Sequence, residues 1–274
     1  MAAAPGEDGW VDAEASAEPD RSRLSSEAGD PDILTLPPPP VLAPAAAHLF
    51  GDRLDLAERY AGLLVGPGQL RGLVGPHERD RIWDRHLLNC AALAELIPRD
   101  ARLVDVGSGA GLPGVVLALA RPDLEVVLVE PLLRRVAFLQ EAVAWLGLER
   151  VRVQRGRAEE LDDAALFADG KAADVVTARA VAPMARLAVW CLPLLRPGGM
   201  LLALKGEGAQ AELADAGGLL DRMGVRARMV RQVGVGLIAE PSTVVLVRLG
   251  DTAVTRALAR RLQRGEARTR RSGE

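Results

Sequence analysis

A short apolar strand that runs into a glycine-rich turn constrains the fold of this chain more than any other feature. Residues 103–106 are apolar except for Asp105, and four glycines follow: Gly107, Gly109, Gly111 and Gly114. Glycine tolerates positive φ and lets a ligand approach the backbone closely. The apolar stretch 115–120 can form a helix, whose first turn offers unpaired N–H groups. The pattern predicts a strand–loop–helix unit that cradles a nucleotide-like cofactor.

This glycine loop is compatible with two kinds of cofactor. Residues 109–114 fit the dinucleotide pattern G-x-G-x-x-G, and Glu130 follows about 20 residues later, where that pattern places a ribose-binding acid. The Asp105 carboxylate would oppose a pyrophosphate but suits the cationic groups of S-adenosylmethionine. The pattern D-x-G-x-G-x-G resembles the first motif of the class I methyltransferases. A tight turn without a ligand is a further alternative, although such a turn needs only one glycine.

Length and composition exclude several other classes of protein. The 274 residues are 49% hydrophobic, which is enough for a substantial core. Two cysteines, Cys90 and Cys191, cannot form a disulfide framework or a four-ligand zinc site, and we expect no bound metal. No apolar run reaches the roughly 18 residues of a membrane span. The N-terminus lacks the pattern of a signal peptide, so we expect a cytoplasmic protein with no membrane contact.

Charge and proline content divide the chain into four segments. Residues 1–40 hold nine acids and two arginines and end in four prolines, which predicts a disordered head. Residues 41–100 are expected to form helices that pack on the core, and residues 101–250 to form the cofactor-binding domain. Residues 251–274 are expected to form a C-terminal helix and a basic tail. The tail could be a solvated helix end or a contact for nucleic acid.

Strands and helices alternate in the central domain. Apolar spacing predicts helices over 45–64 and 79–96, and then strands over 102–106, 125–130, 151–154, 173–177, 200–204, 227–233 and 241–249. Helices are expected over 112–120, 132–146, 183–195, 209–223 and 253–263, and a turn over 195–199. These elements predict an α/β fold with a doubly wound, mainly parallel sheet, one antiparallel strand and helices on both faces.

Ligands of such a sheet bind at the carboxyl ends of its strands. Asp105, Gly107, Glu130, Ala158, Glu159, Thr177, Arg179 and Lys205 are expected at this edge. Glu130 could accept hydrogen bonds from both ribose hydroxyls, and residues 157–160 could hold the adenine. The alternatives are a solvated acid at position 130 and an ordinary acidic helix start at positions 159 and 160.

Missing motifs narrow the choice of methyl acceptor. The segment after residue 177 lacks the D/N-P-P-Y/F cluster of enzymes that methylate exocyclic amines. Cys191 is not placed to be the nucleophile that methylation of a pyrimidine carbon requires. An acceptor that already carries a lone pair, such as a purine N7, needs only correct placement.

Several motifs together resemble one family, the bacterial small-subunit rRNA (guanine-N7) methyltransferase G family. They are the glycine loop at 104–114, Arg-Arg-Val-Ala-Phe-Leu at 134–139, Arg-Ala-Glu-Glu at 157–160, Arg-Ala at 179–180, and Ala-Leu-Lys-Gly at 203–206. Arg-His-Leu-Leu-Asn-Cys at 85–90 is similar to the family's R-H-[IL]-L-D-S signature. This chain differs from the signature at its last two positions, where it has Asn89 in place of the acid and Cys90 in place of the serine. The resemblance covers about residues 45–250.

The resemblance implies a class I methyltransferase that transfers a methyl group from S-adenosylmethionine to N7 of one guanine in 16S rRNA of the small ribosomal subunit. It implies that the reaction needs no general base. Arg179 and Lys205 are the candidate catalytic residues. The cofactor would contact Asp105, Gly107, Gly109, Gly111, Leu112, Glu130, Ala158, Glu159 and Arg179. The RNA would contact Arg85, His86, Arg134, Arg135 and Lys205. We expect a monomer.

Three other functions stay open at this point. A small-molecule methyltransferase on the same fold would have an enclosed apolar pocket. A dinucleotide-dependent oxidoreductase would bind nicotinamide. A non-catalytic RNA-binding module would keep the fold without the activity.

Overall fold

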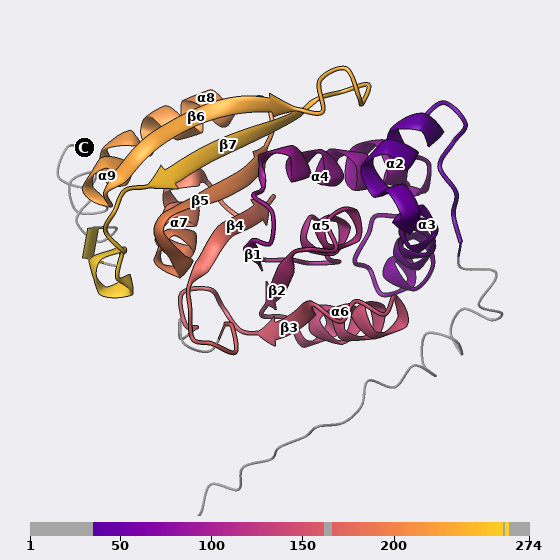
Figure 1. Cartoon of the computed structure of the whole chain (residues 1–274), viewed down its shortest axis with the longest axis horizontal. Helices are drawn as coiled ribbons and strands as arrows, with labels where there is room; N and C mark the ends of the chain where they lie inside the picture. The colour runs from indigo at the N-terminus through magenta and orange to yellow at the C-terminus, as the bar shows by residue number, and fades with distance from the viewer. Residues whose placement is uncertain (1–34, 162–165, 260, 263–274) are drawn as a thin grey trace, which may run out of the picture.

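The computed structural model describes residues 35–161, 166–259, 261 and 262 (Figure 1). The predictions for the first 34 residues of the acidic head and for the basic tail beyond residue 262 lie outside these ranges. Residues 256–259, 261 and 262 are helical, in the region where the terminal helix was expected.

A seven-stranded sheet forms the centre of the molecule, in the order β3-β2-β1-β4-β5-β7-β6. Its strands are β1 (Arg102–Val106), β2 (Glu125–Glu130), β3 (Val151–Arg155), β4 (Ala173–Arg179), β5 (Leu195–Lys205), β6 (Val225–Val233) and β7 (Ser242–Leu249). Strands β1 to β5 pair in parallel, and β7 runs antiparallel to both β5 and β6. The predicted sheet, with one antiparallel strand, is confirmed.

Strand β5 begins earlier than expected. The predicted turn over 195–199 is wrong, because these residues already belong to β5 and Leu195 pairs with Ala173. The register shifts between Ala173 and Val175, and Gly198 has a φ of +72°. Since glycine accepts this conformation at little cost, the glycine pair forms an irregularity inside the strand.

The N-terminal helices are interrupted where one helix was expected over 45–64. Helices α2 (Ala43–Phe50) and α3 (Leu54–Leu63) are joined by the turn η2 (Gly51–Arg53), because Gly51 has a φ of +51°. A wide turn, η3 (Leu64–Gly68), contains Pro67, which lacks the N–H of a regular helix. The predicted helix over 79–96 is helical throughout, as η4 (Arg79–Arg81), η5 (Ile82–Leu88), α4 (Asn89–Ala91) and η6 (Ala92–Leu96).

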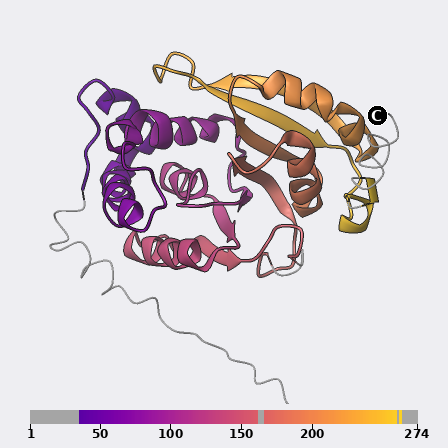
Figure 2. The same cartoon turned by 180° about the vertical axis from the view of Figure 1, so that it is seen from behind.

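The other helices cover the two faces of the sheet (Figures 1 and 2). They are α5 (Gly114–Ala120), α6 (Leu133–Trp145), α7 (Met184–Cys191), η8 (Leu192–Leu194), α8 (Ala209–Asp215) and α9 (Gly217–Arg222). One apolar cluster joins the helices from α2 to α6 to one face, and a second joins α7, α8 and α9 to the other. Successive residues of β1 alternate between them: Leu103 belongs to the first cluster and Val104 to the second.

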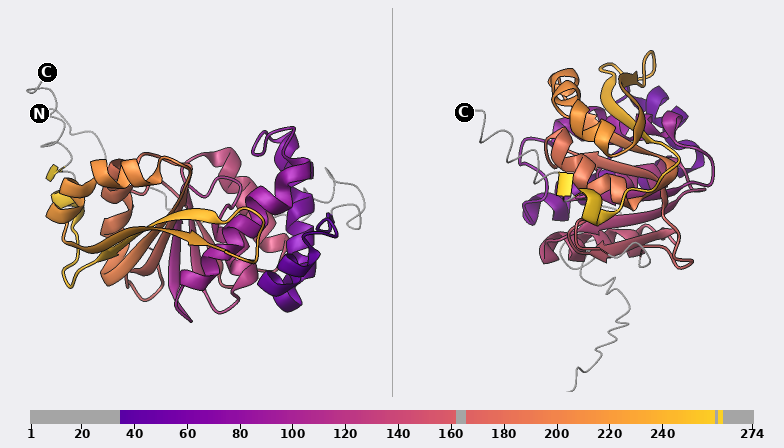
Figure 3. Two further views of the ribbon diagram at one scale, coloured as in Figure 1. Left: turned by 90° about the horizontal axis from the view of Figure 1, so that it is seen from above. Right: turned by 90° about the vertical axis from the view of Figure 1, so that its left-hand side faces the viewer.

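The N-terminal helices gather at one end of the molecule and α8 and α9 at the other (Figure 3). Residues 45–97 share their apolar cluster with β1 and β2, so this segment packs directly on the sheet. In the part of the chain that the structure describes, no helix is long and apolar enough to cross a membrane.

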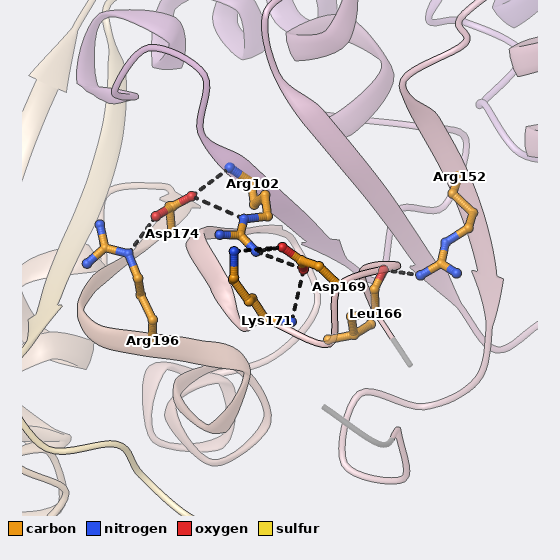
Figure 4. Close-up of polar contacts among 7 residues, drawn as sticks. All are labelled: Arg102, Arg152, Leu166, Asp169, Lys171, Asp174 and Arg196. Carbon is orange, nitrogen blue, oxygen red and sulfur yellow. Dashed lines mark hydrogen bonds and ion pairs between the residues drawn. The ribbon is translucent and has the colours of Figure 1, made fainter. Parts of the chain in front are cut away.

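Ion pairs join the starts of β1, β4 and β5 at the amino edge of the sheet (Figure 4). Asp174 accepts a hydrogen bond from the Arg102 backbone N–H at 2.8 Å and pairs with the Arg196 side chain. Asp169 pairs with Arg102 and Lys171, each at 3.1 Å. These contacts join the strands at the amino edge of the sheet. They do not involve the opposite, carboxyl edge, where a site can form.

Candidate functional site

A cavity of about 520 Å³ lies at the carboxyl edge of the sheet, where β1 and β4 are neighbours and the strand order reverses. We call it the glycine-loop cavity. Open α/β sheets bind ligands at this point. Seven of the predicted cofactor-binding residues line it: Gly107, Gly109, Leu112, Glu130, Ala158, Glu159 and Arg179. Leu73, Val181 and Trp190 also line it, and no sequence motif pointed to them.

Gly107 turns the chain at the carboxyl end of β1. Its φ is +70°, and a Cβ built on it would lie 2.8 Å from Val181 Cγ2. Any larger residue would therefore meet both backbone strain and a steric clash. The missing side chain lets the loop approach the segment after β4 closely, which shapes the wall of the cavity.

Glu130, at the end of β2, is 1% exposed, and its two carboxylate oxygens accept hydrogen bonds from the backbone. One oxygen accepts from the Gly109 N–H and the other from the Leu132 N–H, both at 3.0 Å. Arg135 Nη1 lies 3.6 Å from the same carboxylate. The carboxylate thus fixes the glycine loop against β2 and still lines the cavity, where its remaining lone pairs could accept hydrogen bonds from a ribose.

Asp105 does not lie where we expected it. Its side chain is fully buried, and its carboxylate accepts hydrogen bonds from Gly114 N at 3.1 Å and from Thr177 Oγ1 at 2.9 Å. It does not line the glycine-loop cavity. Its position below the start of α5 explains the difference, because the unpaired N–H groups there attract a carboxylate. Asp105 thus supports the loop from within, and its contact with a cofactor stays a prediction.

This burial makes stability depend on pH. Burial raises the pKa of Asp105 from 3.8 to about 6, despite the opposing hydrogen bonds from Thr177, Ser108 and Gly114. Between these two values the folded state binds more protons than the unfolded state, so stability falls as pH rises. We expect the free energy of unfolding to drop by about 2 kcal/mol between pH 4 and 7, relative to Asp105→Asn. Denaturant titrations of the wild-type protein and of Asp105→Asn would measure this drop. Parallel pH profiles of stability for the two proteins would contradict the prediction.

Tyr60 is a contact of the glycine loop that the sequence did not reveal. This residue of α3 is the only tyrosine in the chain and is fully buried. Its hydroxyl donates to the Ala110 carbonyl at 2.6 Å, and burial raises the pKa of Tyr60 well above 10.0. The neighbouring Gly111 leaves room for it, since a Cβ there would lie 2.7 Å from Tyr60 Oη. The N-terminal helices therefore hold the loop from outside.

Tyr60→Phe is expected to lower the free energy of unfolding by about 1–3 kcal/mol, because the buried Ala110 carbonyl loses its donor. The ring stays in place, so the change isolates the hydroxyl. Chemical denaturation would measure the loss. Trp83→Phe removes both the donor to the Leu36 carbonyl and part of a buried ring, so it shows the larger loss expected when a core side chain away from the loop is also shortened. Full stability of Tyr60→Phe would show that the hydroxyl does not support the loop.

A second cavity of about 1000 Å³ adjoins the first, and we call it the outer cavity. The two share His86, Arg179, Ala180 and Val181 as lining residues. Of these two cavities, Arg85 and Lys205 line only the outer one. Lys205 Nζ donates to the Ala182 carbonyl and to Glu212 Oε2, each at 2.7 Å.

The two arginines of α6 that were predicted to contact RNA lie apart from the outer cavity. Arg135 lines the glycine-loop cavity beside Glu130, so the structure places it with the residues that were predicted to bind the cofactor. Arg134 is exposed and lines neither cavity. Gly111 also lines neither, because it faces Tyr60 and Val115. Among the described residues, no group of acids, histidines and cysteines could hold a metal ion.

The sheet order, the antiparallel β7 and the glycine-loop cavity define a class I methyltransferase, whose cofactor is S-adenosylmethionine. The residues present suit that group, because Gly107 leaves space at the cavity wall and Glu130 presents a buried carboxylate. Residues 53–236 match the family model of rRNA small subunit methyltransferase G, and this chain belongs to that family. The dinucleotide-dependent alternative is thereby excluded.

Two relatives of known sequence agree with the family match. The ribosomal RNA small subunit methyltransferase G of Salinispora arenicola is 61% identical over 212 residues, which cover 77% of this chain and 88% of the relative. The protein of the same name from Mycolicibacterium gilvum is 52% identical, with coverage of 77% and 90%. The solved structure of P. horikoshii TYW2 in complex with MeSAdo aligns with a TM-score of 0.48 and 13% identity, over 61% of this chain and 63% of that one.

Proposed function

We propose that this protein transfers a methyl group from S-adenosylmethionine to N7 of a specific guanine in 16S rRNA of the small ribosomal subunit. The main observation in support of this proposal is that the two cavities share part of their walls. A cavity beside the glycine loop opens next to a larger one that presents Arg85, Arg179 and Lys205. Membership of the rRNA methyltransferase G family supports rRNA as the substrate.

The residues of the glycine-loop cavity would hold the cofactor. We assign Glu130 to the ribose hydroxyls, Ala158 and Glu159 to the adenine, and Gly107 and Leu112 to the wall. When bound, S-adenosylmethionine supplies an activated methyl group. Asp105 acts indirectly, since it holds the start of α5 and the loop above it.

The outer cavity would hold the acceptor base and its phosphates. Guanine N7 carries a lone pair and no proton at neutral pH, so no residue has to act as a general base. The arginines and the lysine of this cavity are suited to bind phosphate oxygens or the guanine O6. Catalysis then depends on placement and on exclusion of water, which can supply roughly 7–11 kcal/mol.

Transfer of labelled methyl groups would test the proposal. The purified protein is incubated with radiolabelled S-adenosylmethionine and with small ribosomal subunits that lack methylation, or with their naked RNA. We expect label on one guanine that borohydride and aniline can cleave, as N7-methylguanine requires. Absence of transfer, despite binding of S-adenosylhomocysteine, would contradict the proposal and favour a small-molecule acceptor.

Lys205→Ala is expected to reduce methyl transfer to RNA about 10-fold and to leave the Kd for S-adenosylhomocysteine within about twofold. Lys205 lines only the outer cavity and holds Ala182 and Glu212 there. Lys171→Ala is the matched control, because Lys171 is the other lysine of the chain and pairs with Asp169 at the amino edge. Kinetics and calorimetry would separate the two effects, and equal losses would contradict this role for Lys205.

The proposal carries two finer expectations. The enzyme acts in the cytoplasm, where small ribosomal subunits are found, and it acts as a monomer. Sedimentation of the full chain with and without subunits would test the second expectation.

A further inference from the structure

We propose that Glu78 and His86 form a hydrogen-bonded chain that fixes the Arg179 guanidinium where the two cavities meet, which makes His86 a positioning residue for methyl transfer. The inference rests on the proposed function, because it concerns the same site. It gives His86 a different role from the RNA contact that the family resemblance implies.

The hydrogen bonds define both partners of the His86 ring. Arg179 Nη2 lies 2.6 Å from His86 Nδ1, and an arginine can only donate, so Nδ1 must be the unprotonated acceptor. The ring proton is therefore on Nε2, which lies 2.7 Å from Glu78 Oε2. One tautomer of neutral His86 satisfies both contacts.

A third contact completes the support of Arg179. Its Nη1 donates to Cys90 Sγ at 3.1 Å, and burial raises the pKa of the Cys90 thiol, which keeps the sulfur neutral. Two of the five guanidinium N–H groups are thus engaged by His86 and Cys90. The other N–H groups can donate toward the cavities, since Arg179 lines both of them.

The support comes from a segment far away in the sequence. Glu78 precedes η4, His86 lies in η5 and Cys90 in α4, whereas Arg179 is the last residue of β4. The His86 side chain is 15% exposed and the Glu78 side chain 30%, so water reaches the carboxylate more readily than the ring. The N-terminal helices thereby orient a cation on the sheet edge, where guanine O6 would lie next to the reacting N7.

Protonation of His86 would break this arrangement. A proton on Nδ1 removes the acceptor and places two cations side by side. The charged groups around the ring are Glu78, Arg85 and Arg179. Burial and Arg179 lower the pKa of His86, while Glu78 opposes them, so the ring is neutral at pH 7. The rate of methyl transfer should therefore fall at acidic pH, below the usual pKa of histidine.

Nitrogen-15 NMR of the histidine rings tests the geometry without any activity. The chain has three histidines, His48, His77 and His86, and the His86→Asn spectrum assigns the third. We expect the His86 ring to carry its proton on Nε2 and to stay neutral at pH 7. A proton on Nδ1, or an imidazolium at pH 7, would overturn the inference.

Two substitutions test the positioning role in the full chain. His86→Asn keeps an acceptor oxygen near the place of Nδ1, whereas His86→Leu removes it. We expect kcat on small subunits to fall roughly 10- to 100-fold in His86→Leu and only a few-fold in His86→Asn. In His86→Asn, the rate of methyl transfer should also no longer fall at acidic pH. His77→Leu, at an exposed histidine, is the matched control.

The outcomes separate this inference from the proposed function. Unchanged kcat in His86→Leu, or equal losses in both variants, would overturn the positioning role. If the wild-type protein transferred no methyl group to subunits, the proposed function would fail, and the tautomer of the His86 ring would still decide the geometry.

Discussion

Gly107→Val is expected to raise the Kd for S-adenosylhomocysteine by more than about 100-fold, which corresponds to roughly 2.7 kcal/mol. The Cβ would lie 2.8 Å from Val181 Cγ2 and 3.1 Å from Cγ1, at a φ of +70° that valine tolerates poorly. Either the loop or the segment after β4 must move, and both line the glycine-loop cavity. Isothermal calorimetry would measure the loss.

Two controls separate the clash from backbone strain. Gly147→Val has a similar φ of +64° at the end of α6, but a Cβ there meets no atom within 4 Å, so we expect lower stability with unchanged affinity. In a double-mutant cycle, Val181→Ala should restore part of the affinity that Gly107→Ala loses. Strictly additive losses would show that Val181 is not the obstacle.

Glu130→Gln is expected to weaken cofactor binding by roughly 5- to 150-fold, equivalent to about 1–3 kcal/mol. The carboxylate accepts from Gly109 N and Leu132 N on different oxygens, and it is almost completely buried. Glutamine has one acceptor oxygen, so its amide group must face one of these N–H donors. The loop would lose an anchor, and the cavity would lose a site for the ribose hydroxyls.

Glu160→Gln makes the same chemical change at an exposed position that does not line the cavity. We expect its affinity for S-adenosylhomocysteine to match that of the wild type. Measuring both variants at two salt concentrations would show whether charge alone explains the effect. Wild-type affinity in Glu130→Gln would mean that neither anchor nor ribose contact matters.

The central sheet could be predicted from the sequence because the residues that define each strand follow one another along the chain. The bounds of β1 and β2 agree with the prediction, since apolar strands there end at acids and turns. The turn expected at Gly198 and Gly199 was wrong, because pairing between β4 and β5 continues across the irregularity. The interruption at Gly51 also escaped prediction, and so did the helical turn that continues past residue 64 through Pro67, since apolar spacing alone does not show them.

The candidate site was predictable where its residues follow one another along the chain. Gly107, Gly109 and Leu112 line the cavity because one loop carries them. Asp105 was placed wrongly, since spacing along a strand does not tell which neighbour a carboxylate will bond to. Tyr60 and Glu78 come from segments that reach the site only after folding. Hydrogen-bond partners so far apart leave no pattern in the sequence.

The close fit between Tyr60 and Gly111 constrains how relatives of this protein can diverge. A side chain at position 111 would collide with the hydroxyl of Tyr60 and with Val115, so any residue larger than glycine there requires changes at these two positions. We expect positions 60 and 111 to covary, although 50 residues separate them. A chimera that exchanges the N-terminal helices between distant relatives should therefore stay active only when the glycine loop is exchanged with them.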